Sequence, residues 1–168
     1  MIPGNRQRNY LQSALYVVIV GTLAATLLER LLTYAEVAEK AAMEATLSRL
    51  HTGLYARVAM LALRGEYEAL EALQNQSPFT AAQVLSANYL GEFVGVPEGN
   101  AAVGKWFYDR LRRELIYVPS LKRHLHPDLS EGATTGLRFR MHVRKTSMNV
   151  YTGVAIEPVG STRWEPSP

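Results

Sequence analysis

Residues Tyr10–Leu28 read YLQSALYVVIVGTLAATLL, a stretch of nineteen residues without a charged side chain. As an α-helix it would span about 28 Å, close to the thickness of the hydrocarbon core of a bilayer. Arg6 and Arg8 precede it, and a Glu-Arg pair that cancels in charge follows it. We therefore expect a transmembrane helix over 10–28 and a basic cytoplasmic leader over 1–9, with the rest of the chain on the far side of the membrane.

Two other interpretations of this apolar stretch remain open. A cleaved secretory signal peptide has the same basic start and apolar middle, and Leu23-Ala24-Ala25 resembles a small-residue cleavage site. A buried helix of a soluble protein is the other, although such helices rarely contain so long an uncharged run. No proline or turn residue separates the apolar stretch from the helical pattern behind it, which favours a membrane anchor.

Helix-forming residues continue beyond the apolar stretch. Residues 29–64 contain no proline and a single glycine, Gly53, and they are rich in Ala, Glu, Leu, Met and Arg. Apolar residues in this segment recur every three or four positions and predict one buried stripe: Leu47, Leu50, Leu54, Val58 and Leu61. The charged residues lie largely off the stripe, with Glu36 and Lys40 as an i,i+4 pair. We expect an amphipathic stem over 29–65 that ends at Gly65.

The period of the sequence changes from helix to strand in the second half of the chain. Strands are expected at 105–109, at 114–118 and at 150–156, where Pro158 ends the last one. A further strand is predicted by a strict alternation of apolar residues (Leu137, Phe139, Met141, Val143) with basic ones (Arg138, Arg140, His142, Arg144). That strand should have one buried face and one cationic face.

These patterns together predict an α+β fold. A long N-terminal transmembrane and stem helix should pack on a roughly four-stranded antiparallel sheet. The sheet and a short helix over 66–73 would form a head domain over 66–168. Segments 78–104 and 119–136 contain several prolines and glycines and are expected to be loops.

At Val17–Leu28, VVIVGTLAATLL, the sequence resembles the type IV pilin and pseudopilin superfamily. An aliphatic run leads into Gly-x-Leu-Ala-Ala, formed here by Gly21, Leu23, Ala24 and Ala25. The order of leader, apolar helix, stem and late strands is similar to the lollipop shape of that superfamily over the whole chain. The resemblance implies a structural subunit that assembles with other pilin-like subunits, as a homo- or hetero-oligomer, through its stem in the bacterial inner membrane.

The chain departs from the superfamily where those subunits are processed. Aligning Gly21 places the first mature residue of the family at Arg8, after Gln7 instead of glycine, and the family's glutamate at Gln12. An uncharged Gln12 cannot form the ion pair attributed to that glutamate, although its amide can hydrogen-bond between helices in a membrane. The resemblance therefore implies a divergent or minor subunit of a type IV pilus or type II secretion pseudopilus. The residues expected to pack its stem against other stems are Gln12, Gly21, Leu23, Ala24 and Ala25. The alternative is a membrane-anchored periplasmic binding or adaptor module outside any filament.

Charge is distributed unevenly along the chain. Residues 29–104 carry nine Glu against five basic residues, whereas 105–145 carry ten basic residues against four acidic ones. Segments of opposite sign favour pairing with another copy or another protein. A basic strip is the best candidate for contact with the acidic stem of an adjacent subunit; it comprises Arg138, Arg140, Arg144 and Lys145. A solvated sheet surface is the plainer interpretation of the strip, and nucleic acid is the weakest candidate partner.

The sequence offers little for catalysis. It contains no cysteine, which excludes thiolate chemistry and Cys-based metal sites, and it lacks the common hydrolase and nucleotide-binding motifs. His124, His126 and Asp128 form the one cluster of metal-ligand residue types, but a closed metal site needs three or four ligands, and a polar loop explains them equally. We expect no enzyme activity, cofactor, metal or small-molecule substrate.

Overall fold

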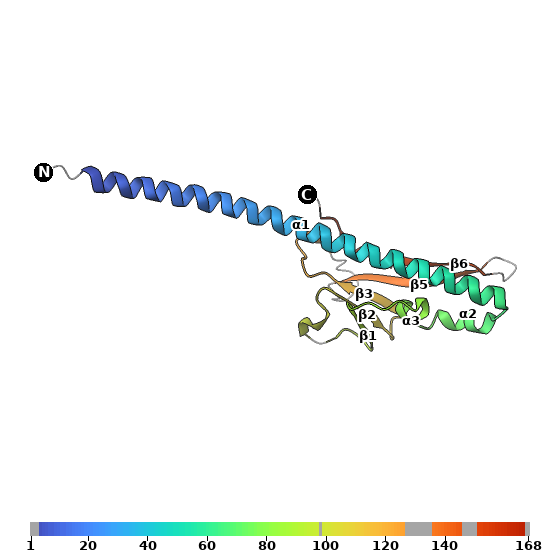
Figure 1. Ribbon diagram of the computed structural model, residues 1–168. Coiled ribbons are helices and arrows are strands. Elements are labelled where there is room, and N and C mark those ends of the chain that lie inside the picture. Colours follow the sequence, from blue (N-terminus) through green and yellow to red (C-terminus); the bar gives the residue numbers. More distant parts are fainter. Residues whose placement is uncertain (1–3, 98, 127–135, 146–150, 167–168) are drawn as a thin grey trace.

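The computed structural model describes residues 4–97, 99–126, 136–145 and 151–166, and of residues 4–9, 11, 99, 100, 145, 151 and 152 it describes the backbone alone. One helix, α1 (Gly4–Arg64), runs the full length of the molecule and carries a compact head along its second half (Figure 1). The predicted α+β fold, with one long N-terminal helix packed on a sheet, is confirmed. The start of the leader, residues 1–3, lies outside the described residues.

The end of α1 is closed by a glycine. Gly65 adopts a φ of 70°, a left-handed conformation that side chains with a Cβ rarely accept. Its amide donates to the Ala62 carbonyl at 3.1 Å, and the amide of Glu66 donates to the Leu61 carbonyl at 3.0 Å. This pair of hydrogen bonds satisfies the last carbonyls of the helix and lets the chain reverse its direction.

Two short helices follow and pack against the end of α1. They are α2 (Tyr67–Leu73), at the position predicted for a short helix, and α3 (Pro78–Ala82). Proline at the first position of α3 is compatible with a helix start because the first amide of a helix has no partner within it. The prediction of a loop that begins at Pro78 is therefore wrong.

The head is built on a five-stranded sheet in the order β1-β2-β3-β5-β6. The strands are β1 (Tyr89–Phe93), β2 (Lys105–Asp109), β3 (Glu114–Val118), β5 (Leu137–Lys145) and β6 (Tyr151–Val159). β1 runs parallel to β2, and the other neighbours are antiparallel. The sheet is therefore mixed, with one strand more than the four antiparallel strands predicted.

The extra elements lie in the two segments predicted to be loops. Segment 78–104 contains β1 and the 3-10 helix η1 (Gly99–Ala102), and segment 119–136 contains β4 (Leu125–His126), which pairs with β7 (Arg163–Trp164) in a second small sheet. β1 reads YLGEF, in which Gly91 weakens the strand signal. A strand of two residues has no period to detect.

Pro158 does not end the last strand as predicted, because β6 continues to Val159. Pro158 pairs with Phe139 of β5 on one side, and β6 is the outermost strand of the sheet on the other. A proline is tolerated on an edge strand, where its missing N–H removes no hydrogen bond to a further strand. The predicted first residue of that strand, Val150, lies outside the described residues.

The main core lies between α1 and one face of the sheet. The predicted stripe on α1 is confirmed at Leu50, Leu54, Val58 and Leu61, which are buried, and Leu47 is half-buried. These residues pack with the aromatic and aliphatic side chains of the sheet, which include Trp106, Tyr117, Phe139, Met141 and Ile156. A smaller core on the opposite face contains Phe107 and Ile116.

The contact between α1 and α3 is too close for a side chain at Gly53. A Cβ added to Gly53 would lie 2.9 Å from the carbonyl oxygen of Ala82 and 3.0 Å from the Cβ of Ala82. The first of these atoms belongs to the backbone and cannot rotate away. Gly53, the only glycine in residues 29–64, therefore allows the two helices to meet.

Gly53→Ala is expected to destabilise the head despite the better helix propensity of alanine. The overlap with Ala82 has to be relieved by backbone movement, which typically costs about 1–3 kcal/mol. Denaturant unfolding of the full chain in detergent measures the change. Gly21→Ala is the matched control, because a Cβ at Gly21 meets nothing within 4 Å; an equal loss of stability in both variants would contradict the proposed contact.

Candidate functional site

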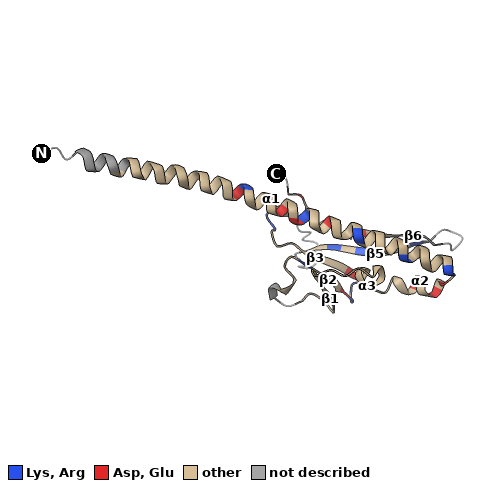
Figure 2. Ribbon diagram, viewed as in Figure 1, with Lys and Arg blue, Asp and Glu red and all other residues tan. Residues whose placement is uncertain are grey.

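The first half of α1 projects from the head without any cover (Figure 2). Its large apolar side chains are 46 % to 73 % exposed: Tyr10, Leu15, Tyr16, Val17, Val18, Ile19, Val20, Leu23, Leu27, Leu28, Leu31 and Tyr34. By length and composition this helix is able to cross a membrane, and none of its most apolar window is buried in the protein. So large an apolar surface needs lipid or other protein to cover it.

The residues predicted to pack stems together all lie on this exposed half. Gln12, Gly21, Leu23, Ala24 and Ala25 are each exposed. The hydroxyls of Thr22 and Thr26 donate back to carbonyls of their own helix, at 2.8 Å and 2.9 Å. Such internal hydrogen bonds suit a helix whose surroundings are apolar. The packing role of these residues stays a prediction, because within the described chain they contact no other element.

Where the exposed stem reaches the head, Glu36 is completely buried on α1, with 0 % exposure. Its Oε1 accepts hydrogen bonds from the Trp164 indole Nε1 at 2.8 Å and from the backbone amide of His124 at 3.1 Å. Its Oε2 lies 2.7 Å from Nδ1 of His124. The carboxylate thus holds two segments of the head that are distant in the sequence.

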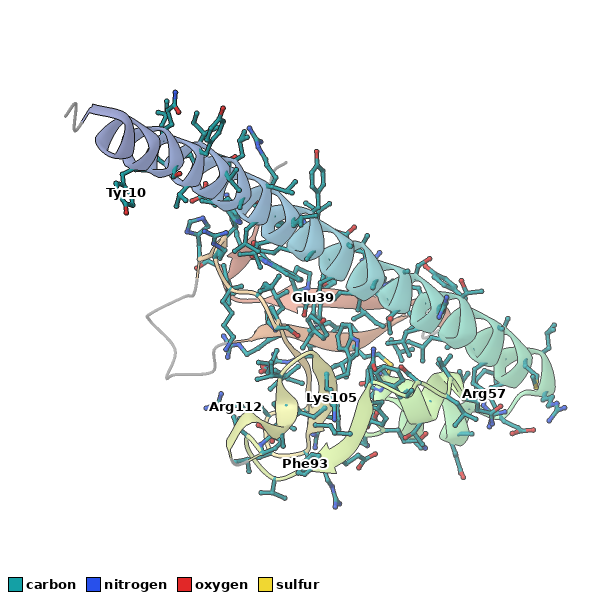
Figure 3. The ribbon with its side chains drawn as sticks, turned by 60° about the vertical axis from the view of Figure 1, so that its left-hand side comes forward. Tyr10, Glu39, Arg57, Phe93, Lys105 and Arg112 are labelled. Carbon is teal, nitrogen blue, oxygen red and sulfur yellow. The ribbon has the colours of Figure 1, made fainter. Side chains whose placement is uncertain are left out.

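Glu39, one helical turn further on, binds the end of β3 (Figure 3). Its Oε1 accepts hydrogen bonds from the Tyr117 hydroxyl at 2.8 Å and from the Ser120 amide at 2.7 Å, and its Oε2 accepts one from the Leu121 amide at 3.3 Å. Residues three apart share one face of a helix, so both carboxylates point to the head. We call Glu36 and Glu39 with their donors the stem–head junction.

The charge on Glu36 is stabilised by its surroundings. Burial alone would raise the pKa of Glu36, because the carboxylate loses water. The hydrogen bonds from Trp164 and His124, together with the attraction of the His124 ring, outweigh burial and leave the pKa lowered. Burial and the contact with Glu39 raise the pKa of Tyr117, which keeps its hydroxyl protonated as a donor.

Sequence reasoning missed the junction because it placed Glu36 on the solvated side of the stem, in a pair with Lys40. In the structure Lys40 is instead 3.9 Å from Glu44, and Glu36 faces the head. A signal was available: Glu36, Met43 and Leu50 are seven residues apart, so the buried stripe extended backwards passes through Glu36.

The candidate metal cluster is divided among different surroundings. His124 belongs to the stem–head junction, His126 is exposed on β4, and Asp128 lies outside the described residues. Over the described ranges of the chain, no three side chains of metal-ligand type gather in one place.

The predicted cationic face of β5 is largely paired with acids. Arg138 is only 7 % exposed and lies 3.7 Å from Glu114, and Arg140 donates to the same carboxylate at 2.6 Å. Arg144 donates to Glu157 at 2.8 Å, and the side chain of Lys145 is not described. The expectation of a uniformly solvated basic face is therefore wrong at Arg138; the role of the strip in subunit contact stays a prediction.

The arrangement of these parts is pilin-like: a long N-terminal apolar helix leaves a head in which its second half covers a largely antiparallel sheet. No match to this chain was found among protein families, curated proteins or solved structures. The likeness therefore rests on architecture and on the short motif around Gly21.

Glu36→Gln is expected to destabilise the head by about 2 kcal/mol or more. The substitution removes the charge that strengthens the hydrogen bonds, and it places the new amide N–H group against the N–H donors of His124 or Trp164. Since the pKa of Glu36 is lowered on folding, its contribution is complete above its ordinary value of 4.5 and is lost as the pH falls through the folded value. Stability curves of the parent and the variant should converge in acid. Denaturant unfolding followed by tryptophan fluorescence measures both effects.

Glu44→Gln serves as the control for this variant. Glu44 lies on the same helix and has a side chain that is 59 % exposed, and its one contact with the described residues is a long ion pair, 3.9 Å, with Lys40. Its substitution should change the free energy of unfolding by about 0.5 kcal/mol or less. Equal losses in the two variants, or parallel pH curves for the parent and Glu36→Gln, would refute the role of the junction.

Proposed function

We propose that this chain is a minor structural subunit of a type IV pilus or of a type II secretion pseudopilus. The observation that carries the proposal is the uncovered apolar half of α1, which continues without a break into the helix that the head packs on. In a filament, apolar stems of adjacent subunits would cover one another, and before assembly lipid would do so. The function is then assembly and not turnover.

The topology follows from charge. Arg6 and Arg8 before the apolar stretch favour a cytoplasmic N-terminus, and the head would lie in the periplasm or on the outside of a filament. Small residues allow close approach of helices in membranes, and Gly21, Ala24 and Ala25 provide them on the exposed stem.

The stem–head junction supports the same function. Because the stem and the core helix of the head are one helix, and Glu36 and Glu39 bind the head at its neck, a subunit packed by its stem holds its head in a defined orientation. A filament needs this property, since its outer surface is built from heads positioned by their stems.

A membrane tether with a binding or adaptor head is the second candidate. The observation that favours it is Gln12, which stands where the resemblance places a glutamate and lacks the charge for that ion pair. A tether requires the same anchor and the same junction, but no contact between stems. The two functions therefore differ in one measurable property, the contact between the stems of neighbouring copies.

Single cysteines at Thr22 and Thr26 should form disulfide-linked dimers in oxidised membranes if stems assemble. The chain has no native cysteine, and both threonine side chains are exposed and hydrogen-bond only within α1. Gly21→Leu, added to either variant, should lower the dimer yield because the bulky side chain separates the helices. Non-reducing gels of membranes, and of sheared filaments, give the measurement.

Thr80→Cys, on the exposed surface of α3, is the reference for random collision between heads. If the cysteines at Thr22 and Thr26 give no more disulfide-linked dimer than Thr80→Cys, the filament function is rejected and the tether is favoured. Release of the chain from membranes by alkaline carbonate would reject both.

A further inference from the structure

A small polar pocket lies beside the start of β3. β3 begins at Glu114 in the chain, and its last pair with β5 at this end joins Leu115 to Phe139, whereas β5 continues to Lys145. Beyond that pair β5 lacks a neighbour on this side, which leaves a gap between β5, the β2–β3 turn and the segment after α2. The gap is a pocket of about 160 Å³.

The lining of the pocket consists mostly of hydrogen-bond donors. Its polar side chains are Gln74, Gln76, Tyr108, Arg113, Arg140 and His142. The described lining thus brings together two guanidinium groups, an imidazole, a phenol and two carboxamides and contains no acidic residue, although Arg140 is bound from behind by Glu114 at 2.6 Å. Guanidinium groups recognise the oxygens of carboxylates and phosphates by charge-assisted hydrogen bonds.

Tyr108 is the least expected member of this lining. The residue is 3 % exposed, and within the described part of the chain its hydroxyl makes no hydrogen bond to another residue and borders the pocket. A hydroxyl in this position can donate to whatever occupies the pocket, water or an anion. Burial raises the pKa of Tyr108, so the hydroxyl remains a donor near neutral pH.

Arg113 supplies a free positive charge. Among the described residues no carboxylate lies within ion-pair distance of it, whereas Arg140 is held by Glu114 at 2.6 Å. Arg113 also adopts a φ of 55°, a conformation that costs energy for a residue with a side chain. Glu92, whose negative charge also acts on the Tyr108 hydroxyl, is itself paired with Arg110 at 3.7 Å.

We propose that this pocket binds an oxyanion of the size of phosphate, sulfate or a carboxylate group, with the Arg113 guanidinium and the Tyr108 hydroxyl as its principal donors. Arg140 and the two glutamines complete the donor set from the other walls. A volume of about 160 Å³ accommodates one such group. The anion is either a free inorganic ion or the carboxylate of a peptide.

Calorimetric titration of the full chain in detergent tests the proposal at pH 7 and constant ionic strength. The probes are phosphate, sulfate, a short peptide with a free C-terminal carboxylate and the same peptide amidated. Binding above the chloride background is expected for phosphate or sulfate if the ligand is inorganic. A preference for the acid peptide over the amide identifies a peptide carboxylate, and both results support the proposed chemistry.

Arg113→Gly separates binding from folding. Glycine accepts a φ of 55° without strain, so this variant should fold at least as well as the parent. Its affinity should be about tenfold weaker or more, as expected for loss of a charge-assisted contact. Tyr108→Phe should weaken binding by a smaller factor, of about threefold to tenfold.

The matched control is Arg112→Gly, which removes the same charge from the same turn at an exposed residue outside the pocket. It should leave the affinity unchanged. The proposal is overturned if none of the four probes binds above chloride, or if Arg112→Gly weakens binding as much as Arg113→Gly, because the effect would then be one of general charge.

Discussion

Two carboxylates on one face of α1, those of Glu36 and Glu39, join the apolar stem to the head. A carboxylate removed from water is costly unless it is hydrogen-bonded. Glu36 is buried and Glu39 is half-buried, and each receives three hydrogen bonds from the head. The donors come from the segment after β3, from Tyr117 and from Trp164. Because moving any of these segments would leave a charge unpaired, the junction fixes the neck of the molecule.

The rest of the architecture depends on the stem–head junction. α1 has two environments along one axis, an apolar surface without cover and a stripe that the sheet buries. Helix continuity sets the axis that both halves share, while the junction determines how the head sits on it. Gly53 and Gly65 then allow α3 to approach α1 and the chain to reverse. A subunit with these properties presents its head in one orientation wherever its stem is held.

Charge on the head is organised locally and not as one surface. Glu114 is buried beside Arg138 and Arg140, and Glu157 pairs with Arg144, so β5 carries much less free charge than its sequence contains. Glu114 and Arg138 are buried, whereas the pair of Arg144 with Glu157 is exposed. Arg113, on the neighbouring turn, makes no ion pair with a described residue, which leaves it available for the proposed pocket. The proposed oxyanion pocket and the stem are separate features, and either one can exist without the other.

The sequence by itself determined the long helix, its apolar and amphipathic halves and the strands β2, β3, β5 and β6, because composition and period are local properties. Only the tertiary structure decided the parallel strand β1, the pairing of β4 with β7, and the buried state of Glu36 and Arg138. The donors to Glu36 lie 88 and 128 residues away in the chain, and no local pattern encodes such a distance. A carboxylate on a helix surface is solvated or buried according to what folds over it, and that depends on the whole chain.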